Sequence, residues 1–345
     1  MLVPRDLPGP SGGTTYNTRV LAAWRSEGLD VTEAAVPGSW PHPSREDRLE
    51  LRETLRQHPR VLIDGIIASA APTELARAAA DGTEIAVLVH LPLPAESGLS
   101  PAQRARLAAS ERAALETAHA VVATSAWARE DLEARYQLGG VAVAEPGVDT
   151  ADLTAGSTPP RLFMLGALTP RKNALLLLQA LTSLQDLAWD AVFAGPDGQD
   201  PGYAERLRRA STELPAGRVS FPGAIAGKEL NTLWRSTDLL ILPSVAETYG
   251  MVVTEALAHG IPAMVGAGTG AEEALRGPGT GGRAELESPG TALDPGDAAT
   301  WARTLRHWLE DDALRHRWKS AAEAHRARMR AWSDAAQDLR TAIHW

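Results

Sequence analysis

The sequence contains no cysteine, which excludes disulfide bonds, thiolate metal sites and a cysteine nucleophile. No apolar run approaches the roughly 20 residues that a membrane-spanning helix needs, and residues 1–8 lack the apolar core of a secretory signal. We therefore expect a cytoplasmic protein. Membrane contact would be at most peripheral, through the basic stretch 314–330, for which a solvated helix face is the simpler interpretation.

Excess positive charge is also missing. Acidic residues outnumber basic ones, 43 against 34, and the net charge is −9, which argues against broad nucleic-acid binding. An apolar fraction of 44% and a charged fraction of 22% are typical of a folded globular protein. A chain of 345 residues is too long for one ordinary core and predicts about two domains.

Short apolar runs alternate with helical patterns along the chain. The expected helices include residues 101–118, 126–136 and 172–184, and the expected strands are residues 60–63, 85–89, 120–123, 162–165, 190–194, 239–242 and 262–265. This alternation predicts an α/β protein with parallel sheets covered by helices on both faces. The segment 150–160 is rich in Pro, Gly, Ser and Thr and marks a linker.

Two Rossmann-like domains that face each other across a cleft are therefore expected. The boundaries indicated by the linker are 1–155 for the first domain and 156–330 for the second. A last helix, 331–345, is expected to cross back to the first domain.

Two glutamates lie eight positions apart at the second domain's strand 239–242. Glu247 follows this strand on a loop, and Glu255 lies in the helix that ends at Gly260. Open α/β sheets bind ligands at the carboxyl ends of their strands. Backbone N–H groups at the start of this helix suit a phosphate, namely those of Tyr249, Gly250 and Met251. Glutamates near a helix start are common for dipole reasons alone, so the spacing by itself favours ordinary surface residues.

The surroundings of the pair reverse that balance. The apolar strand, the Tyr249-Gly250 turn and the Gly260-Ile261-Pro262 exit together resemble the E-x7-E motif of glycosyltransferase family 4. These enzymes are retaining glycosyltransferases with the GT-B fold. The resemblance extends over nearly the whole chain, strongest from 161 to 274 and loosest before 60.

Two adjacent cations, Arg171 and Lys172, follow the first strand of the second domain. Such a pair on its own is usually solvated surface, but its position resembles the phosphate-binding site of the family, where cations compensate the leaving diphosphate. Many members carry an arginine directly after the glycine, where this chain has Ala167. The resemblance implies that Arg171 takes over part of that role.

Other loops of the second domain match less closely. In relatives the base packs near the turn that follows residues 218–223, so Ala224 and Ile225 are candidates for the base pocket, although an ordinary strand-to-helix loop fits equally well. The loop 266–273 replaces the Gly-Gly-x-x-Glu loop of the family and could approach the donor sugar closely.

The first domain offers three candidates. Gly12 and Gly13 end a glycine loop at residues 9–13 that enters a helix, which suits a donor phosphate or the anomeric centre, although a plain turn fits as well. His90 ends the strand 85–89. Relatives often have a histidine there, close to the sugar hydroxyls, whereas the alternative is a capping or core histidine. Only residues 2–4 form the first strand, so either this strand is short or the natural start lies upstream.

The resemblance implies a metal-independent hexosyltransferase that retains anomeric configuration. A UDP- or GDP-sugar would place its phosphates against Lys172 and Arg171, its ribose on Glu255 and its sugar hydroxyls on Glu247. The diphosphate would take the acceptor's proton, and electrostatic stabilisation of the leaving group would supply most of the catalysis. Glu247, Lys172 and His90 are the candidate catalytic residues. The acceptor, whether small molecule, glycan or lipid, is left open, as is the oligomeric state.

Three alternatives use the same pattern. A sugar-nucleotide 2-epimerase or a phosphorylase could share the architecture, although the E-x7-E context favours transfer. An NAD-dependent oxidoreductase is disfavoured, because no G-x-G-x-x-G follows the first strand. A non-catalytic nucleotide-sugar-binding homologue is allowed by Ala167 and the altered 266–270 loop, whereas Glu247, Glu255 and Lys172 count against it.

Overall fold

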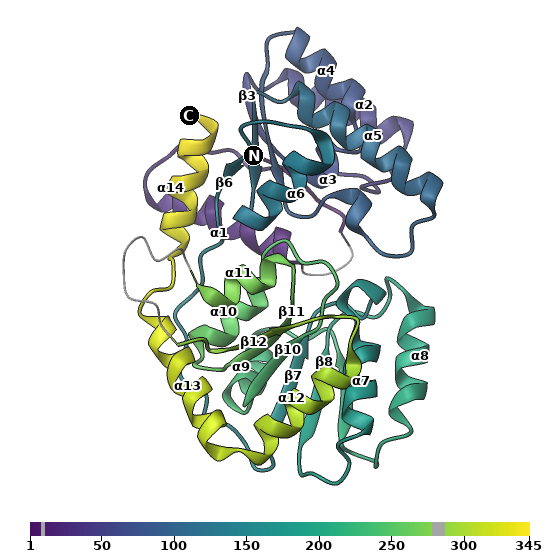
Figure 1. The fold of residues 1–345 in the computed structure, drawn as a ribbon. Helices are drawn as coiled ribbons and strands as arrows, with labels where there is room; N and C mark the ends of the chain where they lie inside the picture. The colour runs from purple at the N-terminus through teal and green to yellow at the C-terminus, as the bar shows by residue number, and fades with distance from the viewer. Residues whose placement is uncertain (8–10, 278–286) are drawn as a thin grey trace. The chain divides into compact units, whose positions relative to one another are not determined.

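The computed structural model describes residues 1–7, 11–277 and 287–345 (Figure 1). Residues 9 and 10 of the predicted glycine loop therefore lie outside the described residues. The chain divides into two compact units. The first comprises Met1–Gly147 with Arg330–Trp345, and the second comprises Val148–Met329.

Within its described residues, the first unit has a parallel sheet of six strands in the order β2-β1-β3-β4-β5-β6. The strands are β1 (Leu2–Pro4), β2 (Ala34–Val36), β3 (Arg60–Asp64), β4 (Glu84–Val89), β5 (Ala120–Ala123) and β6 (Ala142–Val143). The helical segments are α1 (Gly12–Ser26), α2 (Arg45–Arg56), α3 (Gly65–Ala68), α4 (Pro72–Ala80), the 3-10 turn η1 (Leu93–Ala95), α5 (Pro101–Thr117), α6 (Ala126–Tyr136) and α14 (Trp332–Ile343).

Helices cover both faces of this sheet. Ile85, Val87 and Val89 alternate along β4 and pack into one core with residues of α2, α4, α5 and α6, as the two-residue period of a strand requires. Helix α14 packs on α1, β5 and β6. The indole Nε1 of Trp24 on α1 donates to the carbonyl of Ala336 on α14 at 2.9 Å. The last helix of the chain is thus part of the first unit.

The second unit repeats the plan with the strand order β12-β11-β10-β7-β8-β9, again six parallel strands within the described residues. The strands are β7 (Arg161–Leu165), β8 (Asp190–Ala194), β9 (Val219–Gly223), β10 (Leu239–Leu242), β11 (Ala263–Gly266) and β12 (Gly290–Leu293). The helical segments are the 3-10 turn η2 (Pro170–Lys172), α7 (Ala174–Thr182), α8 (Pro201–Ser211), α9 (Gly227–Arg235), α10 (Met251–Ala258), α11 (Gly270–Arg276), α12 (Ala298–Glu310) and α13 (Asp312–Arg326).

Two apolar clusters lie on opposite faces of this second sheet. Helices α7, α8 and α12 pack over Met164 and Ile241, and α9, α10, α11 and α13 pack over Phe163 and Leu240. Neighbouring residues of one strand thus point into different clusters, which is the arrangement of a doubly wound sheet. The predicted α/β class and the covered parallel sheets are confirmed, and each expected strand agrees with the observed one to within one residue at either end.

The helix predicted over 172–184 is wrong in its first turn. The chain forms the 3-10 turn η2, and α7 begins only at Ala174. Asn173, between them, has left-handed backbone with φ of +58°, a conformation that asparagine adopts more readily than most residues. Its side-chain Nδ2 donates to the carbonyl of Pro295 at 2.8 Å. Lys172 therefore lies on a turn ahead of the helix.

The predicted linker 150–160 is bound to the second unit, so the units divide at 147/148, whereas the sequence suggested 155/156. The hydroxyl of Thr154 donates to the carbonyl of Thr237 at 2.8 Å. The backbone N–H of Ala155 donates to the carbonyl of Arg235 at 3.0 Å.

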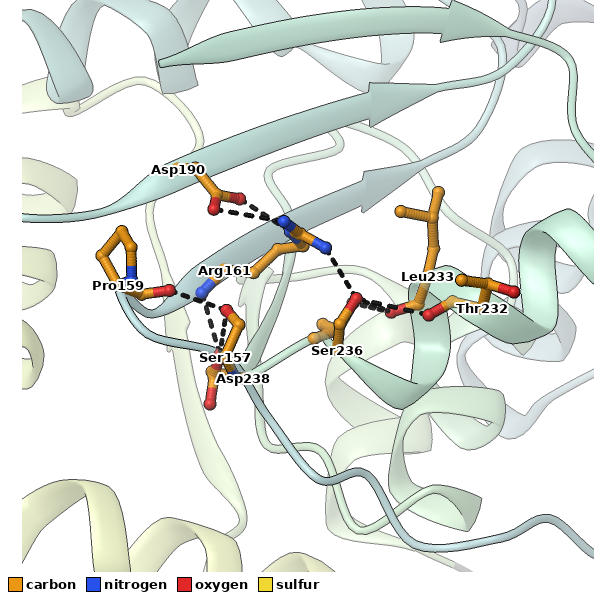
Figure 2. A network of polar contacts seen from close by, with 9 residues as sticks. Ser157, Pro159, Arg161, Asp190, Thr232, Leu233, Ser236 and Asp238 are labelled. Carbon is orange, nitrogen blue, oxygen red and sulfur yellow. Dashed lines mark hydrogen bonds and ion pairs between the residues drawn. The ribbon is translucent and has the colours of Figure 1, made fainter. Parts of the chain in front are cut away.

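Polar contacts continue from this segment at the amino ends of β7 and β8 (Figure 2). Arg161 donates from Nε to Asp190 at 2.7 Å and from Nη1 to Ser236 at 2.7 Å. Asp238 accepts from the backbone N–H of Arg161 at 2.8 Å and from that of Ser157 at 3.0 Å. Burial raises the pKa of Asp238 although these bonds oppose it. This end of the sheet is closed by its own polar groups, and the candidate site lies at the other end.

Candidate functional site at the carboxyl ends of the strands

Three connections meet at the carboxyl edge of the second sheet, those that follow β7, β10 and β11. Because β7 and β10 are hydrogen-bonded neighbours, the turn after β7 and the loop after β10 emerge side by side. The backbone N–H of Val245, in the second connection, donates to the carbonyl of Arg171 in the first at 2.9 Å. The N–H of Gly270, at the start of α11, donates to the carbonyl of Glu247 at 2.7 Å. The loop that carries Glu247 is thus fixed from both sides.

Lys172 and Glu247 form a largely buried ion pair at this edge. The Lys172 Nζ lies 2.6 Å from Glu247 Oε2, and each side chain is 12% exposed. The pair joins two predicted site residues that are distant in the sequence. A contact of this kind costs desolvation of both groups, and its loss on one side would leave an uncompensated buried charge.

Arg171 adds a second cation to the same carboxylate. Its Nη1 donates to the carbonyl of Ala246 at 3.1 Å and lies 3.8 Å from Glu247 Oε2. Burial raises the pKa of Glu247, but the charges of Lys172 and Arg171 outweigh burial and hold that pKa below its ordinary value. The site therefore contains an ionised carboxylate in contact with one cation and 3.8 Å from a second, and such cations suit an anion.

Helix α10 starts directly beyond this ion pair. Gly250 caps it with φ of +85° and, as a glycine, has no side chain to accept a capping bond. Such a backbone favours glycine. Tyr249 is buried in the core cluster on the α10 face of the sheet, and Met251 is the first helical residue. Glu255 lies in the middle of the helix and is half-buried.

The two residues suggested for a base pocket differ in their surroundings. Ala224 follows β9 and is exposed, whereas the side chain of Ile225 is buried in the apolar cluster that contains Trp234. Ile225 therefore supports the turn from inside the core, and of the two side chains Ala224 is the one at the surface.

The candidates of the first unit also contact one another. A Cβ atom at Gly13 would lie 2.8 Å from the His90 ring, so a side chain there would require the ring to shift. His90 Nε2 lies 2.9 Å from Asn17 Oδ1. Asn17 Nδ2 in turn donates to Asp64 Oδ2 at 2.7 Å. Gly12 is the exposed first residue of α1.

Sequence reasoning missed Asn17 and Asp64. A signal for Asp64 existed, because it ends an apolar strand at the carboxyl edge of the first sheet, as His90 does for the neighbouring strand. Asn17 gave no comparable signal, since a single asparagine in a helix is usually exposed. No group of three or more His, Cys, Asp or Glu that could hold a metal ion occurs among the described residues.

The sequence matches the family model "Glycosyl transferases group 1" over residues 149–325, which contain the whole ion-pair site. The chain belongs to this family. Helices long and apolar enough to cross a membrane are not found in the described parts of this group 1 glycosyl transferase.

Among curated proteins, the chain is similar to D-inositol 3-phosphate glycosyltransferase from Salinispora tropica, with 30% identity over 271 residues that make up 70% of this chain and 54% of the relative. A second such protein, from Catenulispora acidiphila, is 29% identical over 72% of this chain and 61% of the relative. The chain therefore spans little more than half the length of the curated relatives it matches.

Solved structures share the fold along the chain. Sucrose-phosphate synthase from Thermosynechococcus elongatus superposes with a TM-score of 0.80 at 16% identity, covering 99% of this chain and 96% of the other. HepE from Anabaena, solved in complex with UDP and glucose, superposes with a TM-score of 0.76 at 17% identity, covering 99% and 98%. The predicted GT-B fold is confirmed.

Proposed function

We propose that this protein transfers a hexosyl group from a nucleotide-diphosphate sugar to an acceptor hydroxyl with retention of anomeric configuration. The observation that supports this most is the largely buried Lys172–Glu247 pair, with Arg171 beside it, at the carboxyl edge of a sheet in a group 1 glycosyl transferase. Two cations beside one carboxylate give a site that can bind a diphosphate. The carboxylate next to them can accept hydrogen bonds from the hydroxyls of the sugar.

In this proposal Lys172 and Arg171 bind the diphosphate together with the start of α10, from Tyr249 through Gly250 to Met251. Their charge stabilises the diphosphate as it leaves, so that no protein nucleophile and no metal ion is required. The leaving diphosphate takes the proton of the acceptor hydroxyl.

The remaining candidates bind the rest of the donor. Glu247 accepts hydrogen bonds from sugar hydroxyls and Glu255 from the ribose, while the turn at Ala224 and Ile225 receives the base. In the first unit, His90 is assigned to the sugar hydroxyls, and Gly12 and Gly13 to the donor's phosphate or anomeric centre.

Two names among the similar proteins suggest where the assays begin. HepE was solved with UDP-glucose, so UDP is the first nucleotide to test, with GDP as the alternative. The curated relatives are named for D-inositol 3-phosphate, which is accordingly the first acceptor to assay. A sugar-nucleotide 2-epimerase remains the alternative activity, and product analysis distinguishes it because an epimerase leaves the nucleotide attached to the sugar.

The test is a calorimetric titration of the purified protein with UDP, GDP and ADP. We expect one nucleotide to bind with micromolar affinity and Lys172→Ala to abolish that binding. The matched control is Lys319→Ala, because the charge of Lys319 acts on the pKa of Asp238, at the opposite end of the sheet from the ion pair. In turnover assays with the matching sugar nucleotide, Lys172→Ala and Glu247→Ala should each lose at least roughly a hundredfold. Binding of a nucleotide that survives Lys172→Ala would remove this site from the proposal.

A further inference from the structure

A chain of three polar side chains lies in the first unit and ends at His90. Asp64, at the end of β3, caps α3 by accepting the N–H of Ile66 on Oδ1 at 3.0 Å. Its other oxygen, Oδ2, accepts from Asn17 Nδ2 at 2.7 Å. Asn17 Oδ1 faces His90 Nε2 at 2.9 Å. Asn17 is 3% and Asp64 5% exposed, so the chain is shielded from water that could replace its bonds.

Asp64 fixes which groups donate and which accept in the hydrogen bonds that join it to Asn17 and Asn17 to His90. A carboxylate that accepts on both oxygens leaves its neighbours only the donor role. Asn17 must therefore turn its NH₂ group to Asp64 and its carbonyl oxygen to His90. The imidazole must then donate from Nε2, because two acceptors facing each other inside the protein would each lose a hydrogen bond. The neutral ring consequently carries its proton on Nε2 and its lone pair on Nδ1.

The surroundings of the ring keep it neutral and oriented. Burial lowers the pKa of His90, and the charge of Asp64, 3.6 Å from Nε2, opposes this without reversing it. Tyr16 packs edge-on at a centroid distance of 5.2 Å and is fixed by its hydroxyl, which donates to the carbonyl of Ala144 at 3.0 Å. Gly13 lets the first turn of α1 approach the ring. Tyr16 and Asp64 are the titratable groups in these contacts.

We propose that Asn17 and Asp64 are positioning residues that hold His90 as the Nε2–H tautomer. Asp64 sets the orientation of the Asn17 amide, and the amide selects the tautomer. This inference deepens the proposed function and rests on it for its catalytic meaning. If His90 contacts a sugar hydroxyl, the lone pair at Nδ1 makes the ring the acceptor of that hydrogen bond, so it selects a donating hydroxyl.

Asp64→Asn tests the proposal because it reverses the direction of both hydrogen bonds, from Asn17 to position 64 and from His90 to Asn17. The new amide can still cap α3 through its oxygen, but it then presents NH₂ to Asn17. The Asn17 amide turns round and donates to His90 Nε2, which moves the ring proton to Nδ1. We expect the ¹⁵N chemical shifts of the His90 ring in the ligand-free protein to report Nε2–H in the wild type and Nδ1–H in Asp64→Asn. The tautomer ratio should shift by about tenfold or more.

Two controls accompany the measurement. The His90 signals are assigned from their loss in His90→Gln. His119 serves as an internal control, because its Nδ1 faces the carbonyl of Ile85 at 2.8 Å and should not respond to position 64. A double variant, Asn17→Asp with Asp64→Asn, restores a carboxylate that can only accept, so it should return His90 to the Nε2–H form.

If Asp64→Asn does not fold, the wild-type spectrum alone decides, because the order of donors and acceptors requires the Nε2–H tautomer there. An Nδ1–H tautomer in the wild type, or an unchanged Nε2–H tautomer in Asp64→Asn, would overturn the proposal.

Activity is measured separately. Asp64→Asn should lower kcat at least about tenfold with little change in the affinity for the nucleotide, and the double variant should recover part of that loss. If the wild-type protein transfers no sugar at all, the proposed function fails, and the ring-nitrogen signals still decide the tautomer.

Discussion

Replacing Glu247 by glutamine should lower the stability of the folded protein and raise its affinity for a phosphate anion. The carboxylate lies 2.6 Å from Lys172 Nζ and 3.8 Å from Arg171 Nη1. Glutamine keeps the shape of the side chain and removes its charge. Two cations, 12% and 14% exposed, then lose the charge of this carboxylate, and an added anion no longer competes with it for them.

The expected cost follows from the burial of the pair. Two unit charges in such close contact attract by about 6 kcal/mol at an effective dielectric constant of about 20. Part of this offsets their desolvation, and removal of one partner of a buried pair typically costs about 3–5 kcal/mol. We expect about 3 kcal/mol, because the cations still reach some water. In a unit of this size that corresponds to a fall in melting temperature of about 6–12 °C.

Calorimetry with inorganic pyrophosphate measures both effects. Pyrophosphate should bind Glu247→Gln about tenfold more tightly than wild type, a gain of about 1.4 kcal/mol, and should restore part of the lost melting temperature. The control is Glu205→Gln on α8, which removes a charge from a pair that is more than half exposed and should change stability by less than about 1 kcal/mol. Weaker pyrophosphate binding in Glu247→Gln would refute the idea that the carboxylate competes with phosphate for Lys172.

Two further substitutions test other parts of the structure. A Cβ at Gly270 would collide with the carbonyl of Thr248 and lie 2.8 Å from the N–H nitrogen of Tyr249, so Gly270→Ala should lower stability by about 1–3 kcal/mol in thermal unfolding. Gly198→Ala, where a Cβ meets nothing within 4 Å, should leave it unchanged, and equal effects would contradict the packing argument. Burial raises the pKa of Glu111 although Tyr136, Leu93 and Ser69 donate to it. As the pH rises above about 4.3, the Glu111 carboxyl therefore ionises in the unfolded chain before it ionises in the folded protein. Stability should therefore fall with rising pH through that window, and urea unfolding of Glu111→Gln should lack this part of the decline.

Strand positions were predictable because a buried parallel strand needs only a short apolar run between polar ends. The run 239–242, for example, is fully buried and could hardly lie elsewhere than in the centre of a sheet. Positions at the carboxyl ends of such runs followed from the same rule, which is why the sequence predicted that Glu247, Lys172 and His90 lie beyond strand ends, where the structure has them. The first turn of the helix after Lys172 was not predictable by that rule, since it depends on the left-handed conformation of the single residue Asn173.

Partners across the chain were harder to predict than positions along it. Asn17 contacts Asp64 and His90, which are 47 and 73 positions further along the sequence. Helical periodicity indicates whether Asn17 is buried, but it does not indicate which strand ends it meets. Such pairings depend on how helices pack over the sheet. A single sequence therefore indicates them only where each of the two contacting residues is a polar residue at the end of a strand.

The position of Arg171 bears on the arginine that many family members carry directly after the glycine, where this chain has Ala167. The turn η2 ends at Lys172, and Asn173, with left-handed backbone, separates it from α7. The two residues before Asn173, Arg171 and Lys172, are left beside the loop that carries Glu247, and the carbonyl of Arg171 accepts from Val245 in that loop at 2.9 Å. A cation four positions later than the family pattern thus still lies within 3.8 Å of the carboxylate. The proposed role of Arg171 rests on this position, which brings positive charge near Glu247 without an arginine directly after Gly166.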